Sequence, residues 1–233
     1  YENRYPGCRV DVPGHSYSYS FAPNHDWSSH FPLADEIRAY FDQCARRFGV
    51  TPHIRFSTDV VAAHYDDETA RWRVHVRDAQ GEESVLQARA VISAVGQLNR
   101  PKMPDIPGLS DFRGPVVHSG AWPQGLDLAG KRVAVIGSGA SAFQIIPELA
   151  ATASHLVALQ RSPVWMFPNP GYHAEVGHGQ RWALEKLPYY SKWYRFWLFY
   201  TSVEGVYSKT LVDPEWNSTR SVSASNDEMR EAL

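Results

Sequence analysis

A glycine-rich turn near the middle of the chain could bind a dinucleotide. The hexapeptide Gly137-Ser138-Gly139-Ala140-Ser141-Ala142 follows an apolar run, 133–136, and precedes a helical pattern. In a strand–turn–helix unit, Gly137 would permit the tight turn, Gly139 would let a pyrophosphate approach the backbone, and Ala142 would let the helix pack close to the strand. The N–H groups at the start of the helix would then face the phosphates.

The segment after this turn distinguishes NADP from NAD. The apolar residues of the helical pattern have the i, i+3, i+4, i+7 spacing that places them on one face of a helix. Pro147 predicts a kink or a short helix. The next apolar run, 155–159, ends in Gln160-Arg161-Ser162, where NAD-binding folds usually carry an Asp or Glu. A guanidinium pairs with a 2′-phosphate, which a carboxylate would repel. We therefore predict NADPH, with Arg161 and Ser162 at the 2′-phosphate; the alternative is that Arg161 is an ordinary surface side chain.

Composition argues against several other classes of protein. The 233 residues carry a net charge of −2, so no bulk field favours nucleic acid or an anionic membrane. Cys8 and Cys44 fit no metal-ligand spacing and are too few for a disulfide framework. We predict two reduced thiols in a cytoplasmic protein, with Cys44 in the core and no metal site. No run of about 18 apolar residues predicts a membrane span.

The other segments predict an α/β chain with a helical region. Residues 1–33 should form ordered loop, 34–48 a helix that stops at Gly49, 53–92 an antiparallel meander beginning at Ile54 and Phe56, 90–96 a buried strand, and 111–130 loop. Between Gln180 and Val203 the sequence is dense in aromatic residues and is split by Pro188. This stretch could be a membrane-surface helix or a helical subdomain packed on the nucleotide domain or on sequence outside the chain. We favour the second interpretation because few basic residues line a polar face.

Both ends of the sequence suggest an internal fragment. The chain begins at Tyr1 without an initiator Met, and it ends in a helical pattern from Asn226 that has no C-cap. We expect a longer protein.

A second motif precedes the glycine turn. By composition alone, Phe112-x-Gly114-x3-His118-x3-Trp122-Pro123 is a loop with one His, and a lone His is more often structural than catalytic. Its spacing nevertheless resembles the FxGxxxHxxxWP fingerprint of type I Baeyer–Villiger monooxygenases at every fixed position. Tyr5-Pro6-Gly7-x3-Asp11 is similar to the end of a second motif of that family, and 90–96 resembles the strand that such flavoproteins place beside the flavin. The segments 213–216 and 220–222 suggest enzymes similar to 4-hydroxyacetophenone monooxygenase.

The resemblance implies a two-dinucleotide-binding-domain flavoprotein of the α/β class. It would have a Rossmann-like FAD domain, truncated here, with an inserted Rossmann NADPH domain and a helical subdomain. Residues 1–125 would belong to the FAD domain and 126–233 to the NADPH domain. NADPH would reduce the flavin, dioxygen would add at flavin C4a, and the resulting peroxide would attack a ketone to give an ester or lactone. The protein would supply orientation and a dry, preorganised site.

The resemblance also implies roles for single residues. Asp11 matches the family's active-site aspartate, which holds an arginine beside the flavin and the nicotinamide; that arginine would lie after Leu233. His118 would act in domain arrangement and not as a general base. The cofactors would contact the side chains or backbone of Tyr5, Asp11, Tyr17, Val60, Gln97 and its neighbour Leu98, Gly137, Ser138, Gly139, Ala140, Ser141, Ala142, Gln144, Arg161 and Ser162.

Two alternatives remain open at this point. A flavin monooxygenase that oxygenates nitrogen or sulfur shares the architecture, although the ending Trp122-Pro123 argues against it. A non-catalytic NADPH-binding module would need no flavin. The GxGxxG expected for FAD is absent from this sequence, so we expect the chain by itself to be inactive and to hold FAD poorly.

Overall fold

The computed structural model describes residues 3–96, 100–162, 164, 166 and 169–232. Contacts divide the chain into two units, one made of Tyr1–Phe41 with Pro101–Leu233 and the other of Asp42–Arg100. The predicted domain boundary at residue 125 does not coincide with either limit. It stays a prediction, because compact units need not follow cofactor domains.

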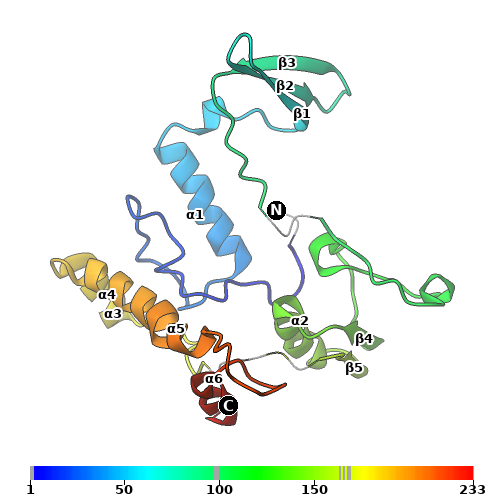
Figure 1. Ribbon diagram of the computed structural model, residues 1–233, viewed down its shortest axis with the longest axis vertical. Coiled ribbons are helices and arrows are strands. Elements are labelled where there is room, and N and C mark those ends of the chain that lie inside the picture. The colour runs from blue at the N-terminus through cyan, green and yellow to red at the C-terminus, as the bar shows by residue number, and fades with distance from the viewer. Residues whose placement is uncertain (1–2, 97–99, 163, 165, 167–168, 233) are drawn as a thin grey trace. The chain divides into compact units, whose positions relative to one another are not determined.

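A parallel βαβ unit forms around the glycine turn, as predicted (Figure 1). Strand β4, Arg132–Ile136, pairs in parallel with β5, His155–Leu159, in the register Ile136↔Leu159. Helix α2, Ala140–Ala150, connects them and buries Ala142, Ile145 and Leu149. The helix continues through Pro147, whose missing N–H removes one intrahelical bond without ending the helix.

The first unit begins with an irregular segment that leads into a helix, and from Asp42 onward the residues of this helix belong to the second unit. Helix α1, Ala34–Arg47, buries Ile37, Tyr40 and Cys44, so the predicted helix and its buried thiol are confirmed. Its C-terminus is a Schellman motif, because Gly49 has φ 65° and the Val50 N–H bonds the Ala45 carbonyl at 2.8 Å. The segment before the helix is ordered by main-chain bonds, among them Gly14 N–H to the His30 carbonyl at 2.8 Å.

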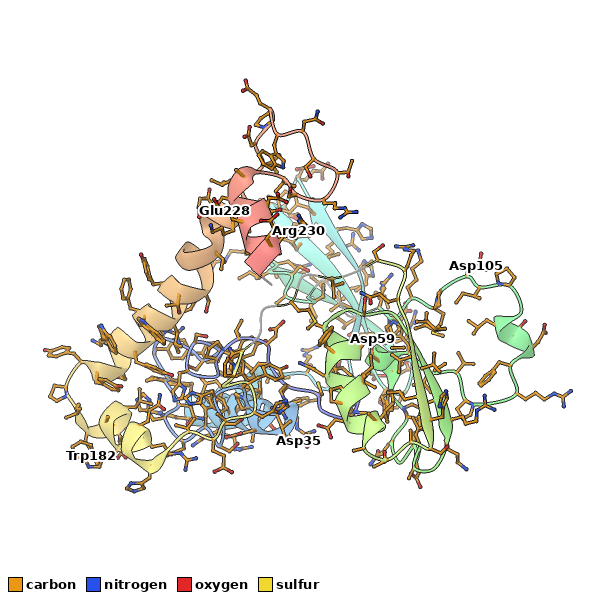
Figure 2. All side chains as sticks on the ribbon, turned by 90° about the horizontal axis from the view of Figure 1, so that it is seen from below. Asp35, Asp59, Asp105, Trp182, Glu228 and Arg230 are labelled. Atoms are coloured by element: carbon orange, nitrogen blue, oxygen red, sulfur yellow. The ribbon has the colours of Figure 1, made fainter. Side chains whose placement is uncertain are left out.

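The helical region follows the predicted split at Pro188. Helix α3, His178–Lys186, and helix α4, Tyr190–Phe199, pack through Leu184, Tyr194 and Leu198. A π-helical stretch, Tyr200–Glu204, leads to α5, Gly205–Thr210, and later to α6, Ala224–Ala232. On α6, Glu228 pairs with Lys209 of α5 at 3.5 Å and Arg230 pairs with Asp227 at 3.0 Å (Figure 2).

The second unit contains the predicted meander. Strands β1, Asp59–Asp66, β2, Arg71–Arg77, and β3, Glu83–Ala88, form an antiparallel sheet in the order β1-β2-β3. The register shifts between Val60 and Ala62, which marks a bulge at Val61. On β2, Arg71, Arg73 and Arg77 are exposed and alternate with the partly or fully buried Trp72, Val74 and Val76.

Two predicted strands are wrong. Ile54 and Phe56 follow a 3₁₀ turn, Thr51–His53, in extended but unpaired chain. Residues 90–96 are also without strand pairing, and Ile92 is 90% exposed. A parallel strand takes its hydrogen bonds from its neighbours, and the described residues place no strand beside this segment.

Candidate functional site

The start of α2 has the geometry of a phosphate-binding turn. Gly137 lies in the left-handed half of backbone space with φ 111°, and its N–H donates to the Leu159 carbonyl at 2.9 Å. This bond extends the parallel ladder by one residue, so the turn begins at the carboxyl edge of the two strands. Ligands bind at that edge in open α/β sheets.

The backbone of the turn is open to an incoming group. A Cβ added at Gly137 or Gly139 would meet no atom within 4 Å. The first bond of α2 runs from the Phe143 N–H to the Gly139 carbonyl at 3.1 Å. The N–H groups of Ala140, Ser141 and Ala142 therefore have no carbonyl one turn earlier in the helix, and they are donors for an anion. These features fit a pyrophosphate.

Arg161 is placed two residues beyond the end of β5 and is exposed. Because Ile136 pairs with Leu159, Arg161 emerges at the same sheet edge as the glycine turn. Its guanidinium forms no ion pair with another described residue, whereas the neighbouring Gln160 side chain is used to bond the Ser162 carbonyl at 3.0 Å. A guanidinium that has no ion-pair partner among the described residues, at the same sheet edge as the glycine turn, fits the 2′-phosphate of NADPH.

His118 begins a short 3₁₀ turn, Ser119–Ala121. Its Nδ1 accepts the Gly120 N–H at 3.0 Å. A Cβ at residue 120 would lie 3.3 Å from that Nδ1, which favours glycine there. The structure therefore gives His118 a cap contact that the sequence did not reveal.

The rest of the fingerprint connects this turn to α2. Phe112 folds over Gly114, where a Cβ would lie 2.7 Å from the Phe112 ring. Trp122 packs against the buried cluster of Tyr5, Ile145 and Leu149. Trp122, which follows His118 by four residues, thus packs against a cluster that includes two residues of α2.

Tyr5 and Gln144 were both predicted to contact a cofactor, and the structure places their side chains in contact with each other. The Tyr5 hydroxyl donates to Gln144 Oε1 at 2.9 Å, and both side chains are buried. Burial raises the pKa of the Tyr5 phenol to about 12, so it remains a donor across the physiological range. Spacing gives no sign of a contact between residues so far apart in the sequence.

The other predicted residues lie in three places. Asp11 is exposed in a bend, and Tyr17 is 45% exposed with its ring edge-on to Phe41. Val60 is 66% exposed on β1, in the second unit. Gln97 and Leu98 lie outside the described residues. No group of three or more metal-ligating side chains is found in the part of the chain that the structure describes.

Buried polar groups without hydrogen-bond partners also occur in residues 1–33, which the sequence predicted to be ordered loop. Both ring nitrogens of His15 are buried and lack hydrogen-bond partners among the described groups. The ring lies edge-on to Tyr194 of α4 with centroids 5.4 Å apart, and Arg195 Nη1 donates to the His15 carbonyl at 3.0 Å. Burial lowers the pKa of His15 to about 4, and His30 and His25 add to this.

These contacts show that the aromatic helices pack on the N-terminal segment. Their outer side chains remain open, and Trp182 on α3 is 52% exposed (Figure 2). None of the described helices has both the length and the apolarity that crossing a bilayer requires.

The fold and site define a dinucleotide-binding α/β protein whose turn is joined to a second motif. Residues 13–182 match the flavin-binding monooxygenase-like family, and the chain belongs to that family. The predicted resemblance to type I Baeyer–Villiger monooxygenases is confirmed by the relatives described next.

Two curated relatives illustrate the match. An uncharacterized monooxygenase of Sinorhizobium fredii, y4iD, is 42% identical over 231 residues, which cover 99% of this chain and 35% of the relative. A Baeyer–Villiger monooxygenase of Streptomyces coelicolor is 46% identical over 167 residues, covering 72% and 31%. The chain therefore spans about a third of the length of these relatives.

Solved structures agree with the fold. OTEMO in complex with FAD and NADP superposes with a TM-score of 0.70 at 36% identity, covering 79% of this chain and 35% of that one. Cyclohexanone monooxygenase bound to ε-caprolactone gives a TM-score of 0.69 at 35% identity, covering 78% and 35%. The Rossmann-type class predicted from the sequence is thereby confirmed.

Proposed function

We propose that this chain is the NADPH-binding part, with adjoining flavin-domain segments, of a Baeyer–Villiger monooxygenase. The observation that carries the proposal is the junction at α2. There the phosphate-binding turn and the Trp122 end of the fingerprint share one helix. The relatives named for Baeyer–Villiger activity and for bound FAD and NADP support it.

The residues of the chain would divide the work between binding and positioning. The N–H groups at the start of α2 would hold the pyrophosphate, and Arg161 with Ser162 would hold the 2′-phosphate. Asp11 would hold an arginine beside the reacting rings, and Tyr17, Val60 and Gln97 would contact FAD. The bound flavin and nicotinamide supply the hydride and oxygen chemistry, while the protein orients them and excludes water.

The finer organisation is also part of the proposal. Residues 1–125 would belong to an FAD domain and 126–233 to an NADPH domain inserted into it. Residues 90–96, whose Ile92 side chain is exposed, would belong to that FAD domain. The two free thiols, Cys8 and Cys44, fit work in the reducing cytoplasm.

The experiment is a product assay on the whole protein that contains this chain. The purified holoenzyme receives NADPH, dioxygen and either a cyclic ketone or a tertiary amine, and products are identified by mass spectrometry. The proposal predicts a lactone that carries one additional oxygen atom and little amine oxide. Amine or sulfur oxygenation without lactone, or NADPH binding without any oxygenation, would contradict it.

A further inference from the structure

The side chain of Gln144 connects three segments of the first unit. It lies on α2, two residues after the last residue of the glycine turn, and is 8% exposed. Its Oε1 accepts the Tyr5 hydroxyl at 2.9 Å and the Arg9 N–H at 3.4 Å. Its Nε2 donates to the Arg9 carbonyl at 3.0 Å and to the Tyr172 hydroxyl at 2.9 Å.

The partners fix which way the amide points. The Arg9 main chain offers one N–H, which only donates, and one carbonyl, which only accepts. Exchanging the oxygen and nitrogen of Gln144 would place a donor against a donor and an acceptor against an acceptor. All four contacts are therefore made in one orientation, and the buried amide is fully satisfied.

Arg9 reinforces this connection from its own side chain. Its Nη1 donates to the Tyr172 carbonyl at 3.3 Å, and its guanidinium lies over the Tyr172 ring, 5.4 Å from the centroid. The Cys8 carbonyl accepts the N–H of Ala34 at the start of α1 at 2.9 Å. Cys8 is thus bonded to the start of α1, and Arg9 is bonded to Gln144 and Tyr172.

Gly7 brings the N-terminal segment into direct contact with α2. Its φ is 74°, and an added Cβ would lie 2.7 Å from the Gln144 carbonyl and 2.8 Å from Glu148 Cγ. Only glycine fits this approach without movement of the helix. Tyr5, Gly7 and Arg9 therefore contact α2 or Gln144, and Asp11 follows two residues later.

We propose that Gln144 is a positioning residue that fixes the Asp11 segment to the helix that holds the NADPH pyrophosphate. The proposal rests on the proposed function, because it concerns the site where Asp11 and the nicotinamide would meet. An apolar side chain of the same size could fill the space, but it could not bond the Arg9 N–H and carbonyl. The Gln144 amide thus fixes the position of the Asp11 segment as well as filling the space beside it.

The test compares Gln144→Met with Gln43→Met in the whole holoenzyme. Gln43 is an exposed residue of α1 and controls for the substitution itself. For Gln144→Met we expect the dissociation constant of NADP⁺ to stay within about twofold, because the turn and Arg161 are intact. The ratio of ester formed to NADPH consumed should fall about fivefold or more. A purely structural residue would lower the yield or melting temperature and leave that ratio unchanged in the folded enzyme.

Amide hydrogen exchange separates this proposal from the proposed function. Exchange of residues 8–12 should become faster in Gln144→Met whether or not the enzyme oxygenates ketones. Tyr172→Phe, which removes one of the four contacts, is a milder variant should Gln144→Met fail to fold, and it should show a smaller change in the same direction. Unchanged exchange in these variants would overturn the proposal, as would normal coupling in an active enzyme. A loss of NADP⁺ affinity equal to the loss of coupling would also overturn it, because Gln144 would then contact the cofactor.

Discussion

Two glycines of this chain have different physical reasons for being glycine. Gly7 has φ 74° and abuts α2, whereas Gly139 has φ −75° and faces open space. Gly7→Ala should therefore cost about 2 kcal/mol or more of folding stability through strain and overlap. Gly139→Ala should cost less than about 1 kcal/mol. Urea unfolding of both variants measures this difference, and equal losses would contradict it.

Gly139→Ala should instead impair nucleotide binding. The added methyl group would occupy the space through which a pyrophosphate approaches the backbone, so NADPH affinity should fall about tenfold. Titration calorimetry at matched folded fraction measures the affinity. Unchanged affinity would mean that the phosphates lie elsewhere.

His15 should make folding sensitive to acid. Its folded pKa is lowered to about 4, below the ordinary value of 6.5, so the unfolded chain binds a proton first as the pH falls. The contribution of neutral His15 to the free energy of unfolding is fully present above pH 6.5. It is lost as the pH falls from 6.5 to about 4, which lowers the free energy of unfolding by about 3 kcal/mol. Urea unfolding at a series of pH values tests this.

The matched variant for this prediction is His15→Phe, which keeps a ring beside Tyr194. Its stability should fall less steeply between neutral pH and pH 4. Some slope should remain, because burial also lowers the pKa of His25 and of His30. An acid slope identical to that of the unsubstituted chain would contradict the account.

At the scale of elements, His118 matters through the 3₁₀ turn that it caps. His118→Ala removes the acceptor for the Gly120 N–H, so the turn between Pro115 and Trp122 should loosen. We expect less oxygenated product for each NADPH consumed by the whole enzyme. His118→Asn, whose side-chain oxygen can accept the same N–H, should recover much of the coupling. Fully coupled turnover in His118→Ala would refute this role.

The sequence correctly predicted the helices and strands whose packing and hydrogen-bonding partners lie close to them in the chain. The βαβ unit, α1 with its stop at Gly49, and the meander each follow from local apolar spacing and turn residues. The strand predicted at 90–96 failed because its ladder depends on neighbouring strands that the described residues do not supply. The hydrogen bonds of Gln144 could not be predicted either. Its partners Tyr5 and Arg9 are distant from it in sequence, and a hydrogen bond between distant residues leaves no periodic pattern.

At the scale of the whole molecule, the described residues contain one parallel βαβ unit and one glycine turn of the dinucleotide type. The chain by itself should therefore bind NADPH without retaining FAD. Absorbance of the purified chain near the flavin bands, after incubation with FAD and gel filtration, checks this. A stoichiometrically yellow protein would show that the segments present here suffice for the flavin.

The most direct measurement for the central claim is a calorimetric titration of NADPH and NADH into this chain and into Arg161→Asp. Arg89→Asp serves as the control, because Arg89 is exposed after β3 and far in sequence from the turn. The account predicts that NADPH binds about tenfold or more tightly than NADH, and that only Arg161→Asp removes this preference. Equal affinities in the unsubstituted chain, or an unchanged preference in Arg161→Asp, would contradict it.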